Sequence, residues 1–153
     1  MQTDYERIGG DAVLTPMMRD FVATLVVDPM IGFFFDRVDH SVLLQREIEL
    51  TAAMLGADVA YSGRPLREAH AKHPILGGQF MRRRELFRLA MVRHALPEDV
   101  IGRLLAHLDR LRPLVTREAG SACAGVGNTV GPLWVEVIPG HAERVLDPGP
   151  SRA

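Results

Sequence analysis

Apolar residues recur three or four positions apart through the first part of the chain, which is the spacing of an α-helix with one buried face. This pattern predicts four longer helices, over about residues 15–27, 40–55, 79–94 and 97–115, and two shorter ones over about 4–8 and 66–72. No strand pattern competes with these helices before residue 118. The fold class predicted for this part is therefore all-α.

Glycine, proline and capping residues separate the predicted helices. Thr15 and Pro16 form a favourable cap and first-turn pair, so we expect the second helix to begin there. Asp39 is expected to cap the third helix and Gly56 to end it. These signals place short connections between helices, as in one helical domain.

The composition changes near residue 118. Positions 119–153 contain six glycines and four prolines, which a helix does not accommodate. We therefore divide the chain into a helical domain over residues 1–118 and a Gly/Pro-rich, irregular C-terminal extension over residues 119–153. Within the extension Leu133–Ile138 alternates weakly and could form a short strand. Packing of Trp134 on the main body and binding of Trp134 to a partner both stay open.

Charge and cysteine content exclude several classes of protein. The 153 residues carry 18 basic and 19 acidic side chains, a net charge of −1, which argues against non-specific nucleic-acid binding. The longest apolar stretch, residues 21–35, is broken by Asp28 and Pro29, so it cannot span a membrane. The single cysteine, Cys123, excludes a disulfide framework and fits a reducing compartment. We expect a soluble, cytoplasmic protein.

Motifs for several common chemistries are missing from the sequence. It has no phosphate loop, no His-Glu-x-x-His run and no Gly-x-Ser-x-Gly elbow. The candidate that remains is His70, on a short helix in a chain with several phenylalanines. On its own, a histidine on an apolar helix is more often structural than a ligand.

A series of short motifs makes this histidine more informative, because the motifs occur together and in a characteristic order. They are Tyr5-Glu6-Arg7-Ile8-Gly9-Gly10, Asp28-Pro29, Phe34-Phe35, Val38-Asp39, Leu55-Gly56, Tyr61-Ser62-Gly63-Arg64, Arg67-Glu68-Ala69-His70, Phe80 and Leu96-Pro97. The series resembles the truncated haemoglobins, most of all their group I, over about residues 4–116. The resemblance implies a two-over-two helical sandwich around haem b.

The resemblance also implies roles for individual residues. His70 falls on the proximal histidine, which binds the haem iron through a neutral imidazole nitrogen. Arg46 falls at a position from which a basic side chain can reach a haem propionate. Phe35 falls on a phenylalanine that packs flat against the haem near the boundary of its proximal and distal sides. The residues that the resemblance places on the proximal and lower side are Leu66, Ile75 and Phe80.

The distal side departs from the family pattern. The family usually has a tyrosine where Val22 stands, and neither Val22 nor Leu43 can donate a hydrogen bond to a bound gas. Glu47 falls where glutamine is common. An ionised Glu47 would only accept hydrogen bonds, whereas a protonated one could donate. This pattern favours redox or sensing chemistry over tight oxygen storage.

The run Arg82-Arg83-Arg84 is a second departure, because an apolar or aromatic residue normally faces the haem near Arg83. Three interpretations are open. The guanidinium group could extend outward along its apolar stem, Arg83 could pair with Glu47 across the pocket, or the pocket could have lost haem and be filled or bind an anion.

The function predicted is that of a haem-binding truncated globin whose iron binds a diatomic gas, namely oxygen, nitric oxide or carbon monoxide. Oxygen transport, nitric-oxide dioxygenation and peroxidase-like turnover are not separated, because the distal residues are atypical. His40 could supply a sixth iron ligand if its helix tilts inward, although a solvated first-turn residue is the simpler interpretation. The alternative is a haem-free interaction or regulatory module, in which the arginine run and Trp134 contact a partner. The oligomeric state is not indicated.

Overall fold

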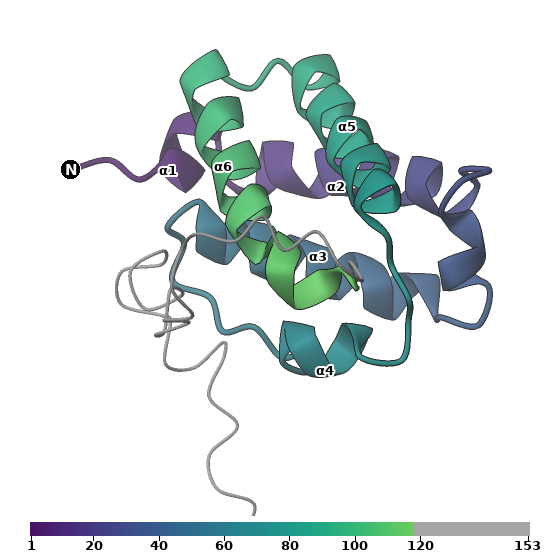
Figure 1. Cartoon of the computed structure of the whole chain (residues 1–153). Coiled ribbons are helices and arrows are strands. Elements are labelled where there is room, and N and C mark those ends of the chain that lie inside the picture. Colours follow the sequence, from purple (N-terminus) through teal and green to yellow (C-terminus); the bar gives the residue numbers. More distant parts are fainter. Residues whose placement is uncertain (118–153) are drawn as a thin grey trace, which may run out of the picture.

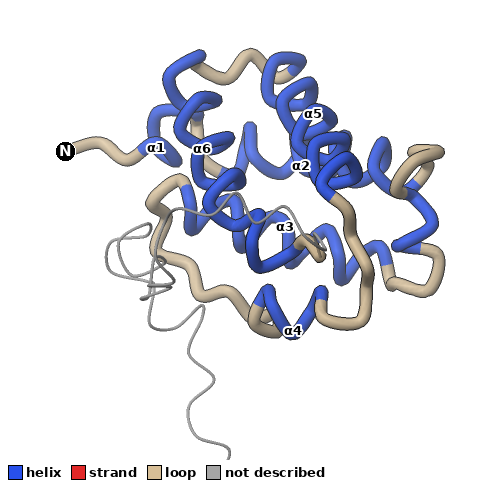
Figure 2. Tube along the Cα trace, viewed as in Figure 1, coloured by secondary structure: helices blue, strands red, loops and turns tan. Residues whose placement is uncertain are grey.

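Six α-helices and one 3₁₀ helix form the part of the chain that the computed structural model describes, residues 1–117 (Figures 1 and 2). The sequence-predicted strand at Leu133–Ile138 and the contacts of Trp134 lie outside the described residues. No strand occurs within residues 1–117. In chain order the elements are α1 (Asp4–Ile8), α2 (Asp11–Val26), η1 (Gly32–Phe35), α3 (His40–Met54), α4 (Leu66–His70), α5 (Gly77–Arg93) and α6 (Glu98–Val115).

The helices pack in one connected series. Helix α2 packs against α3 and α5, and α5 packs against α6. Helix α6 also contacts the short helix α4, and in Figure 1 it descends from the upper part of the view to α4 at the lower edge. Of the helices within residues 1–117, none combines the length and the apolar character that crossing a membrane requires.

Helix ends follow the capping signals in the sequence. The Asp39 carboxylate accepts a hydrogen bond from the Ser41 N–H at 2.8 Å and so caps α3, as predicted. Gly56 follows the end of α3 at φ 88°, and Gly9 and Gly10 join α1 to α2 at φ 100° and 63°. Because residues with a Cβ rarely adopt these left-handed conformations, glycine allows both sharp turns.

The predicted start of the second helix at Thr15 and Pro16 is wrong. Helix α2 begins one turn earlier, at Asp11, because the Gly10 carbonyl accepts from the Val13 and Leu14 N–H groups. Pro16 removes one hydrogen bond from this helix, and its ring crowds the carbonyl of Ala12, four residues earlier. The extra turn buries Leu14 completely, which compensates for that loss.

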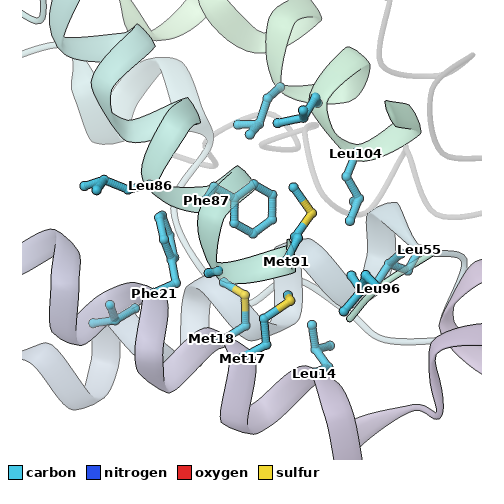
Figure 3. Packing of buried hydrophobic residues seen from close by; sticks show 14 of the residues in the cluster. Leu14, Met17, Met18, Phe21, Leu55, Leu86, Phe87, Met91, Leu96 and Leu104 are labelled. Carbon is cyan, nitrogen blue, oxygen red and sulfur yellow. The ribbon is translucent and has the colours of Figure 1, made fainter. Parts of the chain in front are cut away.

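The hydrophobic core lies between α2, α5 and α6. Figure 3 shows Met17 and Met18 of α2 near Met91 of α5, with Leu104 of α6 close by. Phe21 and Phe87 pack ring against ring, with centroids 5.1 Å apart. The core side chains with at most 1% of their surface exposed are Leu14, Met17, Met18, Phe21, Leu25, Ala53, Met91, Val100 and Leu104.

Candidate functional site

A cavity of about 500 Å³ is lined by residues from η1 and α3 to α6 and from the segments that connect them. Most of its wall is apolar, and α6 contributes Leu108, Leu111 and Val115. The structure brings all nine sequence-predicted site residues to this one cavity, and they are Phe35, Leu43, Arg46, Glu47, Leu66, His70, Ile75, Phe80 and Arg83.

His70 is the last residue of α4, and the helix fixes both its position and its protonation. Its Nδ1 lies 2.7 Å from the carbonyl oxygen of Leu66, one turn earlier. Because a carbonyl only accepts, Nδ1 must be the donor, and in a neutral ring Nε2 then keeps its lone pair. Burial lowers the pKa of His70. The result is a neutral imidazole with Nε2 available to a metal.

Two other histidines, His73 near the end of α4 and His40 at the start of α3, lie in different surroundings. His73 is exposed but lines the cavity, with its ring edge-on to Phe34 at 6.1 Å. His40 is also exposed, and its Nε2 lies 3.2 Å from the Phe35 carbonyl oxygen. His40 is not part of the cavity wall. This arrangement is that of a first-turn residue on α3, not of a second iron ligand.

Val22, which stands where the family usually has tyrosine, is 5% exposed and packs in the core. No residue of α2 is part of the cavity wall. The second helix of this chain therefore supplies no polar group to the cavity.

Glu47 and Arg83 form an ion pair between α3 and α5. Nη2 of Arg83 donates to both carboxylate oxygens of Glu47, at 2.8 and 2.7 Å. Of the three interpretations of Arg83, the one that agrees with the structure is its pairing with Glu47. In this arrangement both carboxylate oxygens of Glu47 accept hydrogen bonds from Arg83.

The two neighbouring arginines are also ion-paired, each with a different part of the fold. Arg82 lies 2.8 Å from the carboxylate of Asp28, whose side chain is only 2% exposed. The Arg82 hydrogen bond is the main cause of a lowered pKa for Asp28. Arg84 donates to both oxygens of Asp109 on α6, at 2.7 and 2.9 Å. Neither Arg82 nor Arg84 is part of the cavity wall.

Polar residues from α3 and the segment before α4 form part of the cavity wall. Arg46 interacts with Glu49 at 3.3 Å and with the Ser62 hydroxyl. Glu49 also accepts from the Ser62 N–H at 2.9 Å, which ties this segment to α3. Arg64 is exposed, lines the cavity and forms no ion pair with any residue in 1–117.

The wall contains apolar residues that sequence reasoning did not select, among them Val38 and Val42. Val38 and Val42 line the cavity although 40% and 45% of their surface is exposed. An isolated exposed valine carries no signal, but two that border one cavity indicate a surface that a ligand covers.

A helical sandwich that presents a neutral histidine to a large apolar cavity has the architecture of a globin. Residues 3–117 match the family model described as "Bacterial-like globin". The chain belongs to this family, whose members include the truncated haemoglobins.

Individual relatives agree with this family. The chain is 26% identical over 117 residues to the group 1 truncated hemoglobin GlbN of Mycolicibacterium paratuberculosis, covering 76% of this chain and 86% of that protein. The truncated hemoglobin of Tetrahymena pyriformis in its Fe(III) form superposes with a TM-score of 0.70 at 20% identity, over 76% of this chain and all of that one. The 2/2 hemoglobin of a Synechococcus species, solved in the cyanomet state with covalently attached heme, superposes with a TM-score of 0.69 at 20% identity, over 74% and 98% of the two chains. The predicted two-over-two helical fold is thus confirmed.

Proposed function

We propose that this chain binds haem b, with His70 as the proximal iron ligand, and that the iron binds a diatomic gas such as oxygen, nitric oxide or carbon monoxide. The observation that carries the proposal is the position of the His70 ring in the cavity and the hydrogen bond that its Nδ1 makes. Its Nδ1 is fixed by the Leu66 carbonyl at 2.7 Å, and the ring borders an apolar cavity of about 500 Å³. A neutral imidazole in apolar surroundings is the donor that haem iron takes from a globin.

The residues of the cavity fit haem in other respects. The mostly apolar wall suits the flat face of a macrocycle, and an occupant would cover the exposed surface of Val38 and Val42. Two arginines on the same wall, Arg46 and Arg64, suit the two propionate groups, since a guanidinium binds carboxylates well.

When bound, haem supplies an iron with a coordination position for a gas and two accessible oxidation states. The chain's own residues then set the surroundings. The Leu66 carbonyl orients the His70 ring and increases the donor strength of Nε2. Phe35 and Leu43 contribute apolar surface that excludes water, and the paired Glu47 and Arg83 are the polar groups beside them.

The absence of a tyrosine at position 22 favours redox or sensing chemistry over tight oxygen storage, because Val22 offers no hydrogen-bond donor. A cytoplasmic location, a globin domain over residues 1–118 and a separate extension over residues 119–153 are further parts of the proposal.

The structure favours this function over a haem-free interaction module. The module would need the arginine run as a basic contact surface, but each of the three guanidinium groups is paired with a carboxylate of the same chain. Because Arg83 lines the cavity while Arg82 and Arg84 pair with Asp28 and Asp109, the run does not form one basic surface for a partner protein.

The absorption spectrum of the full chain, produced with ample haem, tests the proposal. We expect a Soret band that is lost or strongly changed in His70→Ala. His73→Ala is the matched control, because His73 borders the same cavity, and it should keep the wild-type band. A wild-type protein without the band would favour the haem-free module, and an unchanged band in His70→Ala would refute the proximal assignment.

A further inference from the structure

Arg83 brings unused hydrogen-bond donors to the cavity wall. A guanidinium group has five N–H donors. Only Nη2 of Arg83 is engaged, with Glu47, and the Nε and Nη1 groups have no acceptor among residues 1–117. The side chain is 23% exposed. Because an arginine stays protonated, it places a permanent positive charge in a largely apolar wall.

The position of the guanidinium group is set by two neighbours. Glu47 holds Nη2 from α3 through two contacts of 2.8 and 2.7 Å. The Arg83 Cζ also lies 5.2 Å from the ring centroid of Phe21, a core residue that is 1% exposed. A cation over an aromatic face is attracted to it. Because the group is held before any ligand arrives, little side-chain entropy is lost when a ligand binds.

Arg83 and Glu47 line the same cavity as His70, the residue that we assign to the iron. A ligand that shares the cavity with His70 lies within the field of the same pair.

We propose that Arg83, positioned by Glu47, makes this cavity selective for small anions over neutral diatomic gases. The inference rests on the haem binding proposed above. The ligands concerned are monoanions of the class of azide, nitrite or fluoride, which bind ferric haem iron and offer lone pairs to the free N–H groups of Arg83. A charge-assisted hydrogen bond is about twice as strong as a neutral one. A neutral gas such as carbon monoxide gains much less from the same charge.

The test uses the full chain loaded with haem. Azide is titrated against the ferric form and carbon monoxide against the ferrous form, both followed by absorption. In Arg83→Met the azide Kd should rise about tenfold or more, which corresponds to the loss of one hydrogen bond to a charged group. The carbon monoxide Kd should change by less than about threefold. The matched control is Arg84→Met, which removes an arginine outside the cavity wall and should leave the azide Kd unchanged.

A second variant acts in the opposite direction. Glu47→Gln keeps an amide oxygen that can accept from Nη2 and so hold the guanidinium in place, but it removes the negative charge that repels an incoming anion, so azide should bind more tightly. In the R83M background the same E47Q change should no longer tighten binding. If R83M does not retain haem, E47Q alone decides, and unchanged or weaker azide binding in it would overturn the inference.

The outcomes also separate this inference from the haem proposal. A wild-type chain without a Soret band overturns both. A normal band with the same azide Kd in wild type and R83M overturns only the selectivity of Arg83. Equal losses of azide and carbon monoxide affinity in R83M would also overturn it, because they would reflect a change in the cavity as a whole.

Discussion

Two regions of the domain contain similar apolar side chains but use them differently. In the packed region, between α2, α5 and the first half of α6, residues such as Leu14 and Val100 are completely buried. In the cavity region, Leu43 and Leu111 are only partly buried and border about 500 Å³ of space. Helix α6 belongs to both, since its apolar stripe begins in the core and continues along the cavity wall. Protein interiors are normally close-packed, so the second region differs in having room for a ligand such as the haem proposed above.

Of the changes predicted from this comparison, truncating a core side chain should have the largest effect on the free energy of unfolding. Leu14→Ala should lower the free energy of unfolding by about 3 kcal/mol, because Leu14 is fully buried and its removal leaves a hole in a tight core. Val42→Ala, at the exposed edge of the cavity, should cost less than about 0.5 kcal/mol. Urea unfolding of both variants under identical haem loading measures the contrast. Similar losses would show that the two regions do not differ in packing.

Haem binding should raise the free energy of unfolding by an amount comparable to the loss in Leu14→Ala. The size of this rise depends on the haem concentration. At a haem concentration about 100-fold above Kd, the free energy of unfolding should rise by about 2.7 kcal/mol, because only the folded chain offers the site. Thermal unfolding with and without added haem measures the rise, and His70→Ala should abolish most of it. Equal stabilisation of wild type and H70A would indicate that haem binds elsewhere.

The smallest effect should come from a surface cluster that joins α1 to α6 beside the packed region. Asp99 pairs with Arg7 and with Arg103, each at 2.8 Å. Hydrogen bonds from Arg103 and then from Arg7 lower its pKa to about 2. The folded pKa is below the ordinary value of about 3.9. The contribution of Asp99 to stability is therefore present above about pH 4 and is lost as the pH falls towards 2.

Asp99→Asn should flatten this acid part of the unfolding profile and change the stability at neutral pH only slightly, because exposed ion pairs are screened by water and salt. The unfolding midpoint measured between pH 2 and 7 tests this. Glu98→Gln is the control, since it removes the neighbouring acid, which forms no ion pair within residues 1–117. Identical profiles for the two variants would contradict the role of the cluster.

Much of the fold could be predicted from the sequence, because local signals specify it. The Asp39 cap, the turn at Gly56 and the helical stripes act over a few residues, and the structure confirms them. The start of α2 could not be predicted in this way. Pro16 has the form of a first-turn residue, and only the tertiary burial of Leu14 shows that the helix starts earlier.

The candidate site also has a part that the sequence predicts and a part that depends on tertiary contacts. The resemblance to truncated haemoglobins, together with helical spacing, selected residues that all border one cavity. The partner of Arg83 could not be selected, because Glu47 is 36 positions away and three interpretations satisfied the same spacing. The contribution of Val38 and Val42 was also invisible, since the shape of a cavity depends on the connections between helices as well as on the helices.

The three consecutive arginines of α5 have a consequence for how the domain assembles. Successive side chains on an α-helix point about 100° apart, so Arg82, Arg83 and Arg84 face three different neighbours. They meet Asp28 after α2, Glu47 on α3 and Asp109 on α6. If α5 docked after slipping by one residue or rotating by the equivalent angle, all three pairs would separate together and the buried Asp28 would lose its cation. One helical turn therefore specifies the register and rotation of α5, and misdocked states are disfavoured at three points at once.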